Sequence, residues 1–196
     1  LYPQYSGATT GSTFDAIADV FKRTRWVPEL HFVGGYHQSD AFIKALCSSI
    51  SRHIDAHGHP DKLIFSYHGT PERYLKNGDP YYCLCHQTTQ LVAEKMNLTE
   101  DNIMTSFQSR FGREPWLQPY TDKTLETLPS VGVNHVAVIC PGFSSDCLET
   151  IEEINIEARE IFSSAGGEKF HYIPCLNDDS EHIEALAQIV DQYLSI

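Results

Sequence analysis

The chain has 196 residues, of which 41% are hydrophobic and 20% are charged, and this is the composition of a folded domain rather than of a disordered tail. Its 26 acidic residues outnumber its 14 Lys and Arg residues, which leaves a formal net charge of −12. This excess argues against a nucleic-acid-binding protein and against electrostatic docking on anionic lipid, because both depend on basic patches.

Helical and strand-like patterns alternate along the chain. Phe14, Ile17 and Phe21 recur at helical spacing and predict a first helix, with Ser12 or Thr13 as its N-cap. Apolar runs predict strands at 30–33, 62–67, 103–107, 133–140 and 170–173. Helical patterns lie at 40–57, 88–96, 122–128, 183–194 and in a long segment from 148 that closes at Gly166. The alternation predicts an α/β fold, with a parallel sheet flanked by helices on both faces.

Two long loops, 69–85 and 108–121, each follow a predicted strand. In open α/β sheets, ligands bind beyond the carboxyl ends of the strands. We therefore expect functional groups within four segments that lie at or after strand ends. These segments are 66–74, 107–120, 140–149 and 174–179.

One histidine, His68, lies at such a strand end, in the sequence Ser-Tyr-His-Gly-Thr-Pro. An imidazole at this place can bind a metal ion or accept a proton near neutral pH. The alternative is a loop histidine that is satisfied by a backbone carbonyl. The other clustered histidines, His53, His57 and His59, are predicted to lie at a solvated helix end.

Glu149, Glu153 and Glu157 recur every four residues in the helical pattern that follows the strand at 133–140. In an α-helix such a row drifts by about 40° per step, so the three stay near one face. A π-bulge would bring them closer to a straight line. They could bind or relay a divalent cation together with His68, or move protons; the alternative is an ordinary solvated acidic face.

The cysteine pattern indicates reduced thiols. The six cysteines lack the repeated C-x2-C spacing of a zinc site, although a metal–sulfur site stays open as an alternative. No apolar run approaches the roughly 18–20 residues that span a bilayer, and no secretory signal pattern is present. We therefore expect a cytoplasmic protein.

Several motifs in one order closely resemble the ferrochelatases, which insert ferrous iron into a porphyrin in haem biosynthesis. They are LIFSYHGTPERYLKNGDP (63–80), TSFQSRFG (105–112), EPWLQP (114–119) and CPGFSSDCLETIEEI (140–154). The opening LYPQYS (1–6) and PCLN (174–177) match the same family. The resemblance implies a metal-inserting enzyme whose partners are ferrous iron and protoporphyrin IX rather than nucleic acid.

The resemblance also implies roles for individual residues. His68 matches the family's active-site histidine, which ligates metal or accepts pyrrole protons, and Glu149 matches the carboxylate opposite it. The residues that it places along a path for metal or protons are His68, Glu149, Glu153 and Glu157. Those that it places near the porphyrin cleft are Tyr81, Trp116, Asp146 and Cys147.

The resemblance implies no tightly bound cofactor, because Fe²⁺ is a substrate of the family. Some members hold a [2Fe–2S] cluster with a cysteine directly after YPQYS and a cysteine group near the C-terminus. Here Gly7 follows that motif and no cysteine follows Cys175, which argues against a cluster. The lack of a membrane-spanning run remains compatible with peripheral membrane association.

The family's members are longer than this chain and contain two similar α/β halves with the cleft between them. The resemblance predicts that residues 1–175 form the C-terminal chelatase half, and that the helix at 176–196 packs on an N-terminal half that is absent here. Two alternatives follow. The chain could be a metal- or tetrapyrrole-binding domain without turnover, or a chelatase for another tetrapyrrole such as coproporphyrin or sirohydrochlorin.

Overall fold

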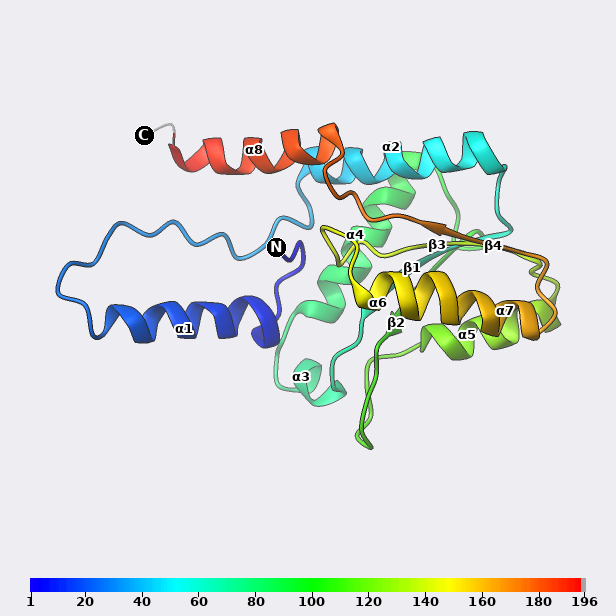
Figure 1. Cartoon of the computed structure of the whole chain (residues 1–196), viewed down its shortest axis with the longest axis horizontal. Coiled ribbons are helices and arrows are strands. Elements are labelled where there is room, and N and C mark those ends of the chain that lie inside the picture. Colours follow the sequence, from blue (N-terminus) through cyan, green and yellow to red (C-terminus); the bar gives the residue numbers. More distant parts are fainter. Residues whose placement is uncertain (195–196) are drawn as a thin grey trace.

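A four-stranded parallel sheet organises the protein in the computed structural model, which describes residues 1–194 (Figure 1). The strands are β1 (Lys62–His68), β2 (Ile103–Gln108), β3 (His135–Ile139) and β4 (Lys169–Ile173), in the order β2-β1-β3-β4. Leu63 of β1 pairs with Ile103 on one side and with Ala137 on the other. All strands therefore end at one edge of the sheet.

Helices connect and cover the strands. The α-helices are α1 (Ser12–Phe21), α2 (Asp40–His57), α3 (Glu72–Lys76), α4 (Tyr81–Met96), α5 (Thr121–Thr127), α6 (Leu148–Thr150), α7 (Arg159–Ser164) and α8 (Ser180–Leu194). Two π-helical segments, η1 (Gly7–Gly11) and η3 (Ile151–Ala158), run directly into α1 and α7, and a 3₁₀ turn, η2 (Leu128–Val131), follows α5. None of the helices in residues 1–194 is long and apolar enough to cross a membrane.

The side chains of β1 alternate between two cores, because successive residues of a strand point to opposite faces. Leu63, Phe65 and Tyr67 belong to the core beneath α2, α4 and α8. Ile64 belongs to the core beneath α5, η3 and α7. Both faces of the sheet are thus covered, which confirms the α/β fold predicted from the sequence.

The strand predicted at 30–33 is wrong. This segment pairs with no strand of the described chain, and Leu30 remains 43% exposed. Phe32 instead packs edge-on against Phe14 of α1, with ring centroids 5.2 Å apart. Figure 1 shows α1 and the segment after it extending beyond the end of the sheet. A short apolar run fits this local packing as well as it fits a strand.

The predicted start of the first helix is also wrong, because helical structure begins at Gly7, with an N-cap six residues before Ser12. The N-cap is Ser6, whose hydroxyl accepts a hydrogen bond from the Ala8 amide. Ser6 itself donates to Asp79, which also accepts from the Gly7 amide. The N-terminal segment is therefore held against the start of α4 rather than capped at Ser12 or Thr13.

The predicted loop at 69–85 contains helix α3 and the beginning of α4, which starts at Tyr81 rather than at Thr88. Asp79 accepts a hydrogen bond from the Tyr81 amide and so satisfies one of the first free donors of α4. The loop between the two helices is only a few residues long.

The long helix predicted from 148 is continuous but is not α-helical throughout. The π-helical segment η3 occupies its middle, as a π-bulge in the acidic row would require. The helix ends where predicted, at Gly166, whose positive φ of 99° favours glycine.

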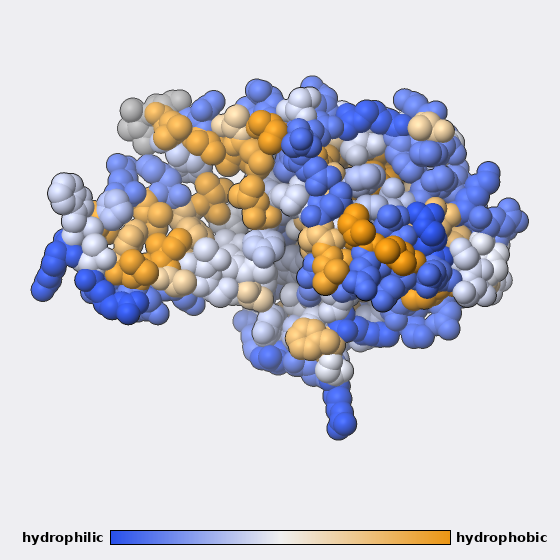
Figure 2. All heavy atoms as spheres, in the orientation of Figure 1, coloured by the Kyte–Doolittle hydropathy of each residue, from blue (hydrophilic) through white to orange (hydrophobic). Residues whose placement is uncertain are grey.

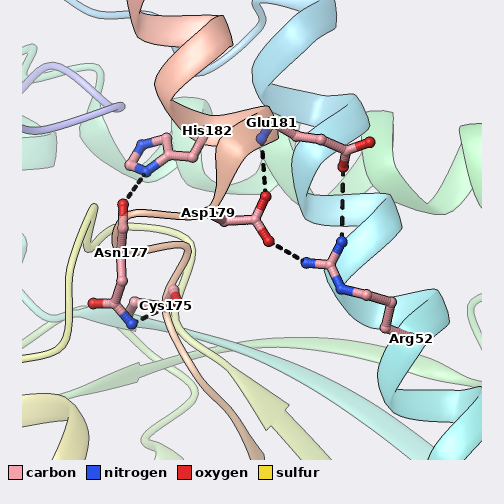
Figure 3. Close-up of polar contacts among 6 residues, drawn as sticks. All are labelled: Arg52, Cys175, Asn177, Asp179, Glu181 and His182. Carbon is pink, nitrogen blue, oxygen red and sulfur yellow. Dashed lines mark hydrogen bonds and ion pairs between the residues drawn. The ribbon is translucent and has the colours of Figure 1, made fainter.

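Helix α8 lies along α2 and divides its apolar residues between two surfaces. Leu186 and Ile189 pack into the core beneath α2, whereas Ile183 and Val190 are each 52% exposed. At its start, Arg52 of α2 forms ion pairs with Asp179 and Glu181 (Figure 3). Figure 2 shows apolar surface over α8 and over α1. Of the predicted helical segment 176–196, residues 195–196 lie outside the described residues.

The prediction of a solvated helix end holds for His59 but not for His53. His59 is exposed, whereas His53 is half-buried between α2 and the sheet. Burial, together with the neighbouring His57, His171 and His135, lowers the pKa of His53 to about 4. His53 and His59, which lie close together in the sequence, therefore have different environments.

Phe65→Ala tests the central packing. Phe65 is fully buried, so we expect this variant to lower the free energy of unfolding by about 3–5 kcal/mol. The same truncation at Phe111, which is 75% exposed, should change it by less than about 0.5 kcal/mol. Urea denaturation of both variants measures the difference; equal effects would contradict the core described here.

Candidate functional site

His68 is the last residue of β1, and its backbone is fixed by close contacts on both sides. The next residue, Gly69, donates a hydrogen bond to the Gln108 carbonyl over 2.8 Å. A Cβ atom at Gly69 would lie 2.9 Å from that carbonyl oxygen and 3.1 Å from the Trp116 ring, so only glycine fits. The Tyr81 hydroxyl donates to the His68 carbonyl over 2.9 Å. Burial raises the pKa of Tyr81, which therefore stays a neutral donor.

The His68 ring has one nitrogen engaged and one available. Its Nδ1 lies 2.7 Å from the Gly69 carbonyl oxygen. Since a carbonyl only accepts hydrogen bonds, Nδ1 carries the proton, and the lone pair of the neutral ring lies on Nε2. The backbone carbonyl thus satisfies one nitrogen and orients the other for binding a metal or a proton.

Two hollows meet at His68 and Glu149, which line both of them. The first, which we call the acidic hollow, has a volume of about 670 Å³. Its charged lining residues in the described chain are Arg110, Asp122, Glu149, Glu152, Glu153 and Glu157. The second, the aromatic hollow, has a volume of about 420 Å³. Its aromatic lining residues besides His68 are Tyr2, Tyr74, Tyr81, Phe111, Trp116 and Phe143.

The acidic hollow carries a strong excess of negative charge. Arg110, the one cation in its described lining, is paired with Asp122 over 2.8 Å and stacks over the Tyr120 ring. Glu149, Glu153 and Glu157 all line the same hollow because the π-helical segment η3 carries the row along it. Such a surface attracts hydrated cations.

Two residues at the end of β2 hold the acidic row in place. Gln108 donates from Nε2 to the Glu149 carbonyl over 2.7 Å, and the Ser109 hydroxyl donates to the Glu153 carboxylate. Ser109 has a positive φ of 63°, a conformation that ordinary residues rarely adopt and that often occurs at functional sites.

Glu149 is held as a carboxylate. A hydrogen bond from the Cys147 thiol, the backbone amide of Glu149 and the nearby His68 ring lower the pKa of its carboxyl group. Near neutral pH, this site therefore offers a negative oxygen ligand beside the imidazole of His68.

Aromatic rings surround the other side of His68. The centroids of the Trp116 and Phe143 rings lie 6.5 and 6.3 Å from that of the imidazole. Phe111 packs on Trp116 at 5.0 Å. The loops after β1 and β2 are joined here, because the Leu117 amide donates to the Thr70 carbonyl over 2.9 Å. The result is a fixed apolar wall that suits a flat aromatic ligand.

The structure places Asp146 and Cys147 differently from Tyr81 and Trp116. Tyr81 and Trp116 line the aromatic hollow, whereas neither Asp146 nor Cys147 is among the described lining residues of either hollow. The Cys147 side chain caps helix α6 and donates a hydrogen bond to Glu149, so it affects the site through Glu149.

Asp146 joins the segment before α6 to the segment after β4. Its carboxylate accepts hydrogen bonds from the Tyr172 hydroxyl, the Thr150 hydroxyl, the Asn177 amide and the Cys175 backbone amide. Burial acts to raise the pKa of Asp146, but these hydrogen bonds outweigh it and hold the pKa below its usual value.

The sequence did not identify five residues of these hollows, Gln108, Ser109, Phe111, Phe143 and Glu152, as site residues. Four of these five residues fall within the segments expected at strand ends. Their position after a strand could therefore have identified them as candidates, whereas their side-chain contacts cannot be deduced from the sequence. The segment 174–179 supports Asp146 instead of lining a hollow.

The chain matches a family model described as Ferrochelatase over residues 1–194. It is 58% identical over 194 residues to the ferrochelatase of Idiomarina loihiensis, an alignment that covers 99% of this chain and 53% of that protein. It is 59% identical over 192 residues to that of Hydrogenovibrio crunogenus, covering 98% and 51%. With Ferrochelatase 2 of Shewanella oneidensis the identity is 57% over 194 residues, covering 99% and 59%. The chain thus spans about half the length of the curated relatives it matches.

Asp146→Asn tests the hydrogen-bonded carboxylate. We expect the variant to be less stable at pH 7 by about 1–3 kcal/mol, because hydrogen bonds to a charged acceptor are lost or weakened. In the unfolded chain Asp146 has an ordinary pKa of about 3.9 and binds a proton first as the pH falls. The wild-type advantage should therefore be complete above pH ~4 and shrink as the pH falls through the lower folded-state pKa.

Chemical denaturation at pH 7 and pH 3 measures this difference. Asp178→Asn is the matched control, since it removes the same charge from an exposed position in the segment after β4 that Asp146 contacts. A stability difference between wild type and Asp146→Asn that does not depend on pH would contradict the role given to the carboxylate.

Proposed function

This chain belongs to the ferrochelatase family, and from that premise we propose that it carries the metal-transfer site of an enzyme that inserts ferrous iron into protoporphyrin IX to form protohaem. One observation carries the proposal: His68 and Glu149 stand where an acidic hollow meets an aromatic hollow. Fe²⁺ and porphyrin are the two substrates, and each hollow has the chemistry of one of them.

The acidic hollow supplies the metal. Its carboxylates attract hydrated Fe²⁺, and Glu157 and Glu153 guide the ion along the helix toward Glu149 and His68. Oxygen ligands and a single imidazole nitrogen exchange divalent cations readily, which suits a metal that must be delivered and not retained. In this proposal Fe²⁺ is a substrate and no resident cofactor is needed.

The aromatic hollow receives the macrocycle. Trp116, Phe111 and Phe143 offer ring faces and edges against which a porphyrin can pack, and Tyr81 fixes the backbone of His68 beneath it. Aromatic rings contribute both buried area and preferred stacking geometry. Protoporphyrin IX is the proposed substrate, and coproporphyrin is the alternative that differs at the edge of the ring.

Proton balance assigns the chemistry of the two central side chains. Insertion adds one Fe²⁺ to the macrocycle and releases two protons from its pyrrole nitrogens. His68 Nε2 accepts a proton through its lone pair, and Glu149 accepts the other or passes it to the acidic row. Each group can first ligate the incoming ion and then, once the ion has passed to the macrocycle, accept a proton on the lone pair that has become free.

We also propose that residues 1–175 form one chelatase half and that the C-terminal helix docks on a second one. The exposed Ile183 and Val190 of α8, which are not part of the core beneath α2, support this arrangement. The length of the curated relatives supports it too. By itself the chain could then bind metal or tetrapyrrole without turnover, which is the second candidate function.

The proposal is tested by incubating the protein with Fe²⁺ and protoporphyrin IX under anaerobic conditions and recording the absorbance change on metallation. His68→Ala should slow insertion by at least about 100-fold, as expected for the loss of a general base and ligand. His59→Ala, an exposed histidine outside both hollows, is the matched control and should retain the wild-type rate.

Three outcomes separate the hypotheses. Insertion that depends on His68 supports the proposal. Porphyrin or metal binding without insertion, both in this chain and in a full-length relative with the same substitutions, supports the binding domain. Insertion at the wild-type rate in His68→Ala removes His68 from the mechanism.

Glu149→Gln and Glu157→Gln rank the acidic row. Glu149 lines both hollows, whereas Glu157 lines the acidic hollow but not the aromatic one. Replacing Glu149 should therefore reduce kcat more than replacing Glu157. Glu157→Gln should mainly raise the KM for Fe²⁺, because it weakens attraction of the ion and leaves the transfer step intact. Steady-state kinetics against Fe²⁺ concentration distinguishes the two effects, and the reverse ranking would contradict the proposed order.

A further inference from the structure

Three histidines from two distant parts of the chain meet on the face of the sheet beneath α2. His53 and His57 lie one turn apart on α2 and therefore on one side of the helix. His171 lies on β4, against which α2 packs. One ring nitrogen from each of the three lies within 4.8 Å of the others. This spacing is compact enough for a single ion to contact all three.

The four rings in this region form a continuous group. The ring centroid of His171 lies 5.1 Å from His53, 4.5 Å from His57 and 5.2 Å from His135. His53 and His57 are 4.6 Å apart. Imidazoles gathered in this way gain little from one another unless a ligand or a shared proton joins them.

A second observation points to a ligand. The Nε2 atoms of His53 and of His135 are buried and have no hydrogen-bond partner in the described chain. A buried polar atom without a partner is destabilising, and native proteins rarely leave one unexplained. A cation bound at the cluster would give the His53 nitrogen a partner.

Some charges around the histidine cluster favour a bound cation and others disfavour it. His57 is the last residue of α2, where the negative end of the helix dipole favours a cation. Burial lowers the pKa of His171, and the neighbouring His57 and His135 and the cations Arg159 and Lys169 lower it further. The Arg159 guanidinium donates hydrogen bonds to the carbonyls of Asn155 and Phe170.

We propose that His53, His57 and His171 form a binding site for a divalent transition metal, separate from the site at His68. Imidazole ligands favour Zn²⁺, Co²⁺, Ni²⁺, Cu²⁺ or Fe²⁺, and disfavour Mg²⁺ and Ca²⁺, which prefer oxygen. His57 is exposed and gives the ion access from solvent. His135 packs against His171 and orients its ring.

The two sites lie toward opposite edges of the sheet. His171 pairs with Ala137 of β3, which pairs with Leu63 near the start of β1. His68 lies five residues further along β1, or about 16 Å along the strand direction. An ion held by the histidine cluster therefore cannot also contact His68, and this proposal does not depend on the proposed function.

Co²⁺ is the appropriate probe, because its visible absorption reports both binding and coordination geometry. We expect the 196-residue chain to bind Co²⁺ at the cluster with a visible absorption band that is lost in His57→Ala and retained in His68→Ala. His59→Ala is the matched control, since it removes a neighbouring exposed histidine outside the cluster, and it should keep the band.

Two further measurements make the result decisive. Because His57 is exposed, His57→Ala should have the melting temperature of the wild type without metal and should lose only the stabilisation that added Zn²⁺ gives to the wild type. In NMR spectra of the histidine rings, Zn²⁺ should shift the signals of His53, His57 and His171 together. A Co²⁺ band and a Zn²⁺ stabilisation that are unchanged in His57→Ala, or no metal binding beyond that lost in His68→Ala, would overturn the proposal.

Discussion

One buried side chain, Gln108, joins the three central elements of the site. Its Oε1 accepts hydrogen bonds from the Ser66 hydroxyl of β1 over 2.8 Å and from the Cys140 thiol beyond β3 over 3.5 Å. Its Nε2 donates to the backbone of Glu149. Parallel pairing brings the strand ends to one edge, and this amide converts that proximity into a fixed relation between His68 and the acidic row. Without it, the backbone of Glu149 would lose this hydrogen bond to β2.

The site separates two kinds of attraction on either side of one histidine. Carboxylates on the helical side act over a distance on a charged ion, whereas rings on the loop side act at contact on a flat apolar molecule. His68 can serve both because a backbone carbonyl fixes which of its nitrogens is free. The proposed reaction therefore needs no movement of the imidazole between its two partners.

The sequence was sufficient to predict the four strands, because each is an apolar run between helical patterns, and to place His68 and Glu149 at strand ends. It failed for the segment 30–33, whose apolar residues pack on α1. Hydrogen bonds such as that from Ser109 to Glu153 depend on a backbone angle that spacing does not reveal. The meeting of His53 with His171 could not be predicted either, since it depends on which helix covers which strand.

The π-helical segment η3 makes the acidic row depend on the number of residues as well as on their identity. Each residue of an α-helix turns the chain by about 100°. Deleting one residue between Glu153 and Glu157 would let the segment return to α-helical bonding. Glu149 and Glu157 would then be seven positions apart and about 20° from alignment, so they would still share one face of the helix. The extra residue of the π-helical segment thus lets the helix keep its carboxylates together at a spacing that an uninterrupted α-helix would spread by about 80°.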